Sequence, residues 1–341
     1  MSTEQRGRVS GFAAMALALA LAGVAPSKGF VPCAPPLTLT DCDLLVTSRA
    51  TSSVLRFDGA TGDYLGDFVS PGSGGLEAAF GMTFGPDGNL YVSEGNPPAG
   101  GTNSDPRVHR YDGSTGAFID HFTQVFAEPI RTIVFGPDGD LYGNTGGTVF
   151  KADGTTGAFI DTFVDLGLGE ATSGLTFGPD GDLYVSSYLA NQVLRFDATT
   201  GLPIEDVFAE VPISGAAGHT AGLTFGPDGD VYVALRDGAD VWRFDGATGD
   251  SLGSFIPLAD IHPDVPSSPI FGPDGNLYVA SQGSDQVLRY DGSTGAFLDV
   301  FASGGDLDEP VALVFVPEPG QLVLVATGAL LLAAVGRRRA P

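Results

Sequence analysis

The amino-acid sequence predicts an all-β fold, a six-bladed β-propeller built from four-stranded antiparallel blades. Its 50 glycines and 24 prolines in 341 residues are a load that turn-rich β structure tolerates and helical folds do not. The string Phe-Gly-Pro-Asp-Gly recurs at intervals of 42 to 51 residues, a period typical of propellers and other repeat arrays. Five copies and one degenerate sixth copy begin at Phe84, Phe135, Phe177, Phe225, Phe271 and Phe315.

Each repeat divides into four short apolar or alternating runs, which predict four strands. In the fourth unit these runs are Gly174-Leu-Thr-Phe, Leu183-Tyr-Val-Ser, Val193-Leu-Arg-Phe and the segment from Leu202. The Gly-Pro-Asp-Gly step between the first two suits a type I turn, because proline pre-sets φ and glycine accepts a positive φ. A second turn, Asp-x-x-Thr-Gly, precedes the fourth strand in all six units, at Asp58, Asp112, Asp153, Asp197, Asp245 and Asp291.

The two ends of the repeat array predict how the ring closes. The run Leu44–Ser48 has the character of a second strand with no first strand before it. The run Val311–Phe315 has the character of a lone first strand. The C-terminal strand is therefore expected to complete the N-terminal blade, which removes the exposed sheet edge. We place the propeller at residues 44–315.

Residues 1–25 are predicted to be a secretory signal peptide. Arg6 and Arg8 precede 19 uncharged residues, and small residues up to Ala25 suit a cleavage site. A retained membrane anchor is the alternative. Residues 26–43 form a proline-rich lead that carries the only two cysteines, Cys33 and Cys42. In an exported chain we expect these two to form a disulfide.

Residues 316–341 resemble the PEP-CTERM sorting signal. They contain the motif Pro317-Glu318-Pro319, an apolar run, and the basic cluster Arg337–Arg339. Eighteen uncharged residues separate Glu318 from Arg337, enough for a tilted or bilayer-thinning transmembrane helix. The resemblance implies export, transient anchoring in the inner membrane by the C-terminal helix, processing by an exosortase-type enzyme, and delivery to the cell surface or the extracellular space. A plain single-span anchor is the alternative.

The repeats themselves resemble NHL-repeat and gluconolactonase-like propellers over residues 44–315. The likeness lies in Gly-Pro-Asp-Gly-x-Leu-Tyr-Val followed by an Arg-Phe-Asp strand. Gluconolactonase-like enzymes hold a calcium ion in the channel with Glu, Asn and Asp side chains. Those ligands do not align with this chain residue by residue, so the resemblance assigns no catalytic residue here.

The charge of the body excludes two classes of partner. Residues 26–320 carry 40 acidic side chains and 11 basic ones, a balance that repels nucleic acid and anionic lipid. Membrane contact is therefore expected only through the terminal segments. Six of the 11 bases share one third-strand position, where we predict pairing with turn aspartates or neighbouring carbonyl groups. They are Arg56, Arg110, Lys151, Arg195, Arg243 and Arg289.

One face of the predicted ring is the candidate binding face. The turns between first and second strands, and between third and fourth strands, are uniform and lie on one face. The remaining connections lie on the other and vary, from Asn144–Gly147 to the long segment Glu94–Pro106. Variation confined to one face of a repeat array marks a binding face.

Acidic residues recur on that variable face, seven positions before the first-strand phenylalanine in five of six units. We predict that they ring the channel mouth, either as ligands of a divalent cation such as calcium or as a funnel for a cationic ligand. A solvated acidic rim is the alternative. Arg131 and His219 break the repeat nearby and join the candidate ligand-binding set. The five acids are Glu77, Glu128, Glu170, Asp264 and Asp308.

The sequence assigns no catalytic residue, because it contains no Gly-x-Ser-x-Gly elbow, no P-loop and no metal-type spacing of its four histidines. The predicted function is a non-enzymatic binding or scaffold module in the envelope or extracellular matrix, with exopolysaccharide or envelope proteins as partners. One alternative is a calcium-dependent lactonase or lyase, with its site at the acidic mouth and His219 or a carboxylate as base. A purely structural matrix protein is the other.

Overall fold

The computed structural model describes residues 42–97, 105–167, 171–211, 219–257 and 260–316. The predicted signal peptide, the proline-rich lead up to residue 41 and the sorting segment from Pro317 lie outside these ranges. Cys42 is disulfide-bonded, and Cys33, the other cysteine of the chain, lies outside the described residues. Within the described ranges, no helix has the length and apolar character needed to cross a bilayer.

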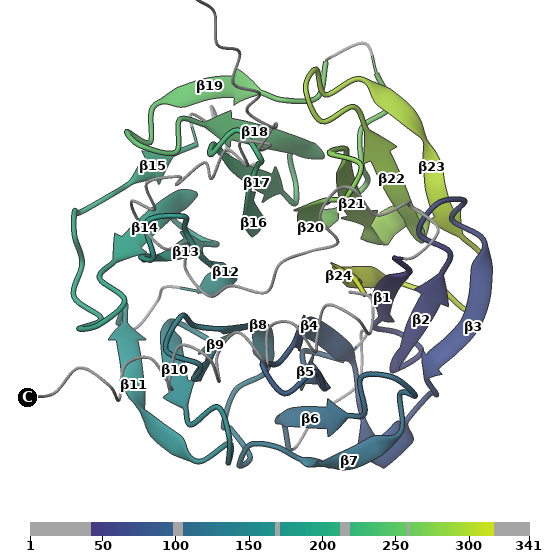
Figure 1. Cartoon of the computed structure of the whole chain (residues 1–341). Coiled ribbons are helices and arrows are strands. Elements are labelled where there is room, and N and C mark those ends of the chain that lie inside the picture. The colour runs from purple at the N-terminus through teal and green to yellow at the C-terminus, as the bar shows by residue number, and fades with distance from the viewer. Residues whose placement is uncertain (1–41, 98–104, 168–170, 212–218, 258–259, 317–341) are drawn as a thin grey trace, which may run out of the picture.

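The first blade contains both ends of the repeat array, as predicted. It consists of β1 (Leu44–Ser48), β2 (Ser53–Phe57) and β3 (Tyr64–Val69), joined by β24 (Pro310–Phe315). The sheet order is β24-β1-β2-β3, and β24 pairs with β1 antiparallel, with Leu44 opposite Phe315. The C-terminal strand therefore closes the ring (Figure 1).

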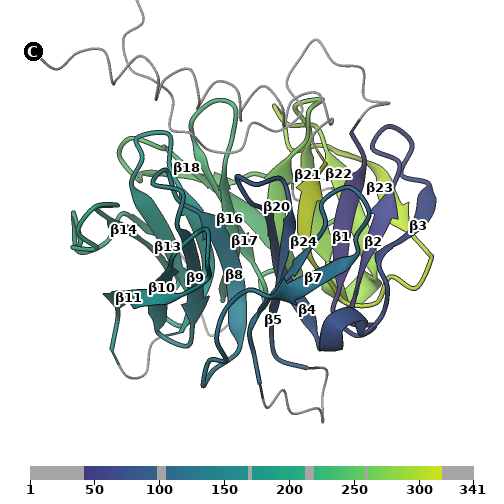
Figure 2. The ribbon, with the colours of Figure 1, turned by 60° about the horizontal axis from the view of Figure 1, so that its bottom comes forward.

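Each of the other five blades is a sheet of four consecutive antiparallel strands, which confirms the predicted six-bladed propeller. The first strand of each blade lies innermost and the fourth lies at the rim (Figure 1), while Figure 2 shows the blades standing side by side around the axis. The strands are β4 (Ala79–Phe84), β5 (Leu90–Glu94), β6 (Val108–Tyr111) and β7 (Phe118–His121); β8 (Ile130–Phe135), β9 (Leu141–Thr145), β10 (Thr148–Ala152) and β11 (Phe159–Asp165); β12 (Thr172–Phe177), β13 (Leu183–Ser187), β14 (Gln192–Phe196) and β15 (Ala209–Glu210); β16 (Thr220–Phe225), β17 (Val231–Leu235), β18 (Asp240–Phe244) and β19 (Ser251–Ser254); β20 (Pro266–Phe271), β21 (Leu277–Ser281), β22 (Gln286–Tyr290) and β23 (Phe297–Ser303).

Aromatic residues of the repeat fill five of the six contacts between neighbouring blades. The fully buried Tyr142 of the third blade packs edge-on against Phe163 of its own blade, with ring centroids 5.1 Å apart. It packs in the same way against Phe177 of the next blade, at 5.2 Å. The Phe of each Phe-Gly-Pro-Asp-Gly string therefore fills the contact between blades, where edge-to-face packing adds to apolar burial. The same tyrosine position is filled by Tyr91, Tyr184, Tyr232 and Tyr278.

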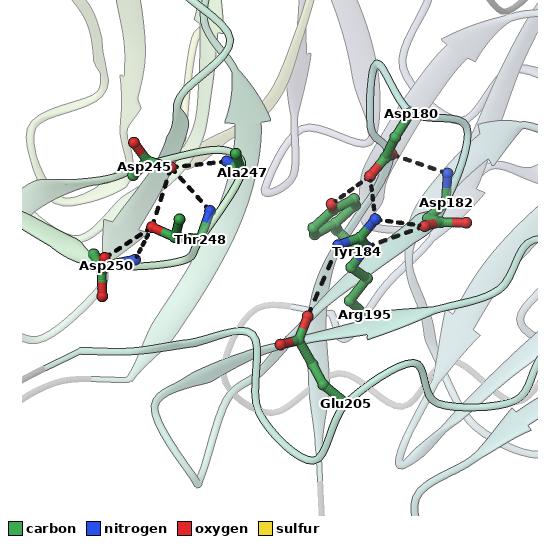
Figure 3. A network of polar contacts seen from close by, with 9 residues as sticks. All are labelled: Asp180, Asp182, Tyr184, Arg195, Glu205, Asp245, Ala247, Thr248 and Asp250. Atoms are coloured by element: carbon green, nitrogen blue, oxygen red, sulfur yellow. Dashed lines mark hydrogen bonds and ion pairs between the residues drawn. The ribbon is translucent and has the colours of Figure 1, made fainter.

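The repeating bases pair with aspartates in all six blades; some of these lie in turns, as predicted, whereas Asp120 and Asp299 lie in fourth strands and Asp43 directly precedes β1. Arg195 contacts Asp180 at 2.7 Å and Asp182 at 2.8 Å, and the hydroxyl of Tyr184 donates to Asp180 at 2.8 Å (Figure 3). The other pairs are Arg56–Asp43, Arg110–Asp120, Lys151–Asp138, Arg243–Asp230 and Arg289–Asp299.

The Asp-x-x-Thr-Gly turns occupy the same face. The Asp245 carboxylate accepts hydrogen bonds from the backbone N–H groups of Thr248 and Ala247 and from the Thr248 hydroxyl (Figure 3). These bonds hold the pKa of Asp245 below its usual range. The polar side chains of the uniform face are thus engaged in holding turns and strands together.

Candidate functional site at the mouth of the central cavity

A cavity of about 500 Å³ lies among the six innermost strands. It falls within the size range of small-molecule sites. Its wall is formed by β4, β8, β12, β16, β20 and β24, and its remaining lining residues come from the connections that follow the second strands.

The innermost strands approach one another so closely that glycine is needed in the wall. A Cβ atom on Gly222 would lie 2.4 Å from the backbone oxygen of Ser267 in the next blade. Side chains of the second strands tie this wall together. The Ser186 hydroxyl accepts from the N–H of Gly174 at 2.6 Å and donates to the carbonyl oxygen of Ala221 in the next blade at 2.7 Å. The wall is thus fixed by hydrogen bonds within and between blades.

The polar lining at one end of the cavity comes from positions where the repeat varies. Four residues each follow directly after a second strand, on the face that carries the variable connections. Arg131 joins them from the second position of β8. We call this set the mouth cluster, and its members are Arg49, Arg131, Tyr188, Arg236 and Gln282.

Arg131 is held against an aromatic pair. Its guanidinium lies 5.5 Å from the centroid of the Tyr188 ring and donates from Nη1 to the carbonyl oxygen of Thr172 at 3.2 Å. The Tyr188 ring stacks on His219 with centroids 4.1 Å apart and an interplanar angle of 4°. His219 in turn contacts the Asp237 carboxylate through Nδ1. The Arg131 guanidinium is therefore positioned by two direct contacts, with Tyr188 and Thr172, and the Tyr188 ring is in turn supported by His219.

Electrostatics at the mouth are dominated by cations. The pKa of Arg131 lies below its usual value. Burial is the main cause and the nearby charge of Arg236 adds to it, whereas Tyr188 acts in the opposite direction. Arg236 donates from Nη1 to Oε1 of Gln282 at 2.9 Å. Gln282 is 5% exposed, and its Nε2 has no hydrogen-bond partner among the described residues. Arg49 donates from Nε to Glu309 at 2.7 Å.

Ion pairing separates two of these arginines from the other bases. Ten Lys and Arg side chains lie in the described ranges, and eight of them form ion pairs with carboxylates there. Arg131 and Arg236 form none within those ranges, and both line the cavity. Among the described residues, therefore, the two cationic side chains without an ion-pair partner both line one cavity.

The four described acids of the predicted ring are exposed and do not belong to the cavity lining. In three of them it is the backbone that takes part in a recurring contact: the N–H groups of Glu77, Asp264 and Asp308 donate to the last side chain of a second strand. Glu128 is the fourth, and Glu170 lies outside the described residues. No three His, Cys, Asp or Glu side chains converge as metal ligands in the described part of the chain. The cation site stays a prediction.

Sequence reasoning found part of the mouth cluster. It selected Arg131 and His219, which the structure brings together through Tyr188. It missed Arg49, Arg236, Tyr188 and Gln282. A signal was available, because these four occupy one register position, directly after the second strand. In two other blades that position holds glycine, so its variation could have marked the site.

Comparison with protein-family models and with curated proteins finds no match to this sequence. Solved structures do match. A chain from a nidogen/laminin complex is 15% identical, with a TM-score of 0.64, over 81% of this chain and 98% of that one. A protein of unknown function from Bacteroides caccae is 12% identical, with a TM-score of 0.60, over 81% and 99%. A catalytically inactive virginiamycin B lyase from Staphylococcus aureus, solved with quinupristin, is 16% identical, with a TM-score of 0.55, over 81% and 89%.

These similarities define the class of protein. The chain is a six-bladed β-propeller, similar in fold to proteins that range from a member of a protein–protein complex to a lyase. At these identities the likeness concerns the fold, which hosts many unrelated functions.

Proposed function

We propose that the protein is an exported, exosortase-sorted propeller that acts as a non-enzymatic binding module in the cell envelope or extracellular matrix. The observation that carries the proposal is the distribution of its polar residues. The repeating bases and turn aspartates bind one another, whereas residues that break the repeat gather around the cavity mouth. Polar groups that are free of structural duties and face a cavity are those available to a ligand.

The terminal segments supply the location in this proposal. The predicted signal peptide at residues 1–25 and the sorting motif Pro317-Glu318-Pro319 with its basic cluster support export followed by release or attachment outside the cell. The fold is compatible with this role, because similar propellers include a chain of a nidogen/laminin complex and a lyase solved with quinupristin.

The residues at the mouth favour binding over the calcium-dependent lactonase or lyase. That alternative requires carboxylate oxygens directed at a shared cation. The described lining of the mouth contains no carboxylate and instead presents guanidinium groups and the amides of Asn96 and Gln282. The donor set does not fit a calcium ion, and we derive no catalytic step from it.

A fractionation experiment in the native host tests the proposal. We expect the wild-type chain at the cell surface or in the medium without its C-terminal segment, and the Glu318→Gln variant retained in the inner membrane. A deletion strain should lose adhesion or matrix retention, and the wild-type gene should restore it. A mature protein in the cytoplasm would contradict the proposed export. A deletion strain with unchanged envelope, matrix and adhesion would contradict the binding role.

A further inference from the structure

The mouth cluster, defined above by Arg49, Arg131, Tyr188, Arg236 and Gln282, contains more N–H donors than the described residues around it satisfy with acceptors. We propose that it binds a small oxyanion with two negative charges, held by Arg131 and Arg236 and by the amide of Gln282. This inference rests on the proposed binding function and names the chemical class of its ligand.

The first step of the argument is charge. Arg131 and Arg236 line the same cavity, and neither forms an ion pair within the described ranges. Two like charges in a poorly hydrated space repel each other more strongly than they would in water. Among the described acids on this face, Glu309 pairs with Arg49 and Asp237 contacts His219. A ligand with two negative charges would neutralise both guanidinium groups.

The second step is the count of hydrogen-bond donors. A guanidinium group carries five N–H donors. Arg131 uses one of them on the carbonyl oxygen of Thr172, and Arg236 uses one on Gln282. The Nε2 group of Gln282 is buried and has no partner within the described part of the chain. A buried donor without an acceptor costs free energy, which an oxyanion at this position would recover.

The third step is orientation. Arg131 lies over the Tyr188 ring, and Tyr188 is stacked on His219, so rotation of the guanidinium is restricted. The Gln282 amide is oriented because its Oε1 accepts from Arg236, which leaves its N–H groups to donate. Planar guanidinium groups held in this way match the paired oxygens of carboxylate and phosphate groups.

The ligand chemistry has two sources, a phosphate ester and a dicarboxylate, which share paired anionic oxygens. Inorganic phosphate and malonate represent them in the test, and acetate represents a single negative charge. Binding is measured by isothermal titration calorimetry on the exported protein with its disulfide intact, above pH 7.5, at an ionic strength held constant with chloride. We expect saturable 1:1 binding of at least one dianion, and acetate binding at least about tenfold weaker.

Matched variants localise the binding. Arg131→Gln and Arg236→Gln should each weaken dianion binding at least about tenfold, because each removes one guanidinium fork. Arg56→Gln makes the same change of charge on the outer part of the first blade, where Arg56 pairs with Asp43, and should leave the affinity unchanged. Thermal melting checks that all three variants are folded. Arg131→Lys keeps the charge and should bind more weakly than the wild type.

The outcomes separate this inference from the proposed function. A preference for phosphate or for malonate supports the inference and identifies the source of the oxyanion. The inference is overturned if neither dianion binds saturably, if folded Arg131→Gln and Arg236→Gln variants bind like the wild type, or if Arg56→Gln loses as much affinity. In those cases the adhesion phenotype of the deletion strain would still decide the proposed function.

Discussion

Replacing Glu94 should test how much of the variable face is structural. Glu94 ends β5, is 3% exposed and occupies a position that holds serine in three of the other five blades. Its Oε1 accepts from the backbone N–H of Glu77 at 2.9 Å, and its Oε2 accepts from the N–H of Arg107 at 3.1 Å. His109, which is 1% exposed, lies with Nε2 2.9 Å from Oε1. The carboxylate thus joins two loops and a buried imidazole.

The Glu94→Ala variant removes the acceptor of two backbone hydrogen bonds and the carboxylate that lies beside the buried His109 imidazole. Two backbone N–H groups left without acceptors cost about 1 kcal/mol each, and a buried polar partner without its carboxylate costs about 1–3 kcal/mol more. We therefore expect a loss of about 3–5 kcal/mol in the free energy of unfolding, measured by urea denaturation with an unchanged m-value. Glu94→Ser should recover part of it, because Ser48 and Ser281 accept the equivalent N–H in their blades.

Glu77→Ala is the matched control, because the Glu77 side chain is exposed and its N–H remains; we expect a change within about 0.5 kcal/mol. The reasoning is refuted if the free energy of unfolding of Glu94→Ala lies within about 1 kcal/mol of the wild-type value. It is also refuted if Glu77→Ala is as destabilising as Glu94→Ala, since the Glu77 side chain, and not only its backbone N–H, would then stabilise the fold.

Three further predictions concern the repeat. Tyr232→Phe removes the hydrogen bond from the Tyr232 hydroxyl to Asp228 at 2.9 Å and should lower the free energy of unfolding by about 1 kcal/mol. Tyr232→Ala also removes the buried ring and should lower it by about 3–5 kcal/mol. Urea denaturation of both variants measures these losses. The pKa of Asp245 is lower in the folded protein than in the unfolded chain, so its carboxylate stabilises the fold fully above the unfolded pKa of about 4. This stabilisation is lost as the pH falls through the folded pKa. Asp245→Asn should therefore reduce the fall of the melting temperature at acidic pH, measured by thermal melts across a pH series. Gly222→Ala places a Cβ against the backbone of Ser267 and should destabilise the fold by about 1–3 kcal/mol; a thermal melt unchanged from the wild type would contradict the close packing of the wall.

The fold could be predicted because its determinants repeat. One string, Phe-Gly-Pro-Asp-Gly, supplies a turn, and its Phe packs against a tyrosine such as Tyr142 of the preceding blade. Five exact copies of this string and one degenerate copy leave little choice of architecture. The lone runs at Leu44–Ser48 and Val311–Phe315 also predicted the closure, because each lacked the partner that the other supplies.

The site was harder to predict because it depends on side-chain direction. The acids at Glu77, Asp264 and Asp308 recur in the sequence, yet what they share in the structure is a backbone N–H contact, and their carboxylates are exposed. A residue-type pattern does not distinguish a conserved backbone contact from a side-chain site. Arg236 and Gln282 share a register position but not a residue type, because a binding residue needed once around a ring has no reason to repeat.

The distribution of charge around the ring favours a small ligand over a long polyanion. Residues 26–320 carry 40 acidic and 11 basic side chains, and most of the basic ones are paired with carboxylates. An extended anionic polymer that lay along this surface would therefore be repelled over its whole length. The charged side chains that line the cavity are Arg49, Arg131 and Arg236, and exposed acids farther away are screened over about 8–10 Å at physiological ionic strength. A compact dianion, or a single anionic group at the end of a chain, therefore gains the local attraction while meeting little of the surrounding repulsion. If the mouth binds an anion as proposed, the acidic body would make it selective, because it would repel the polyanions that an arginine cluster on a neutral surface attracts.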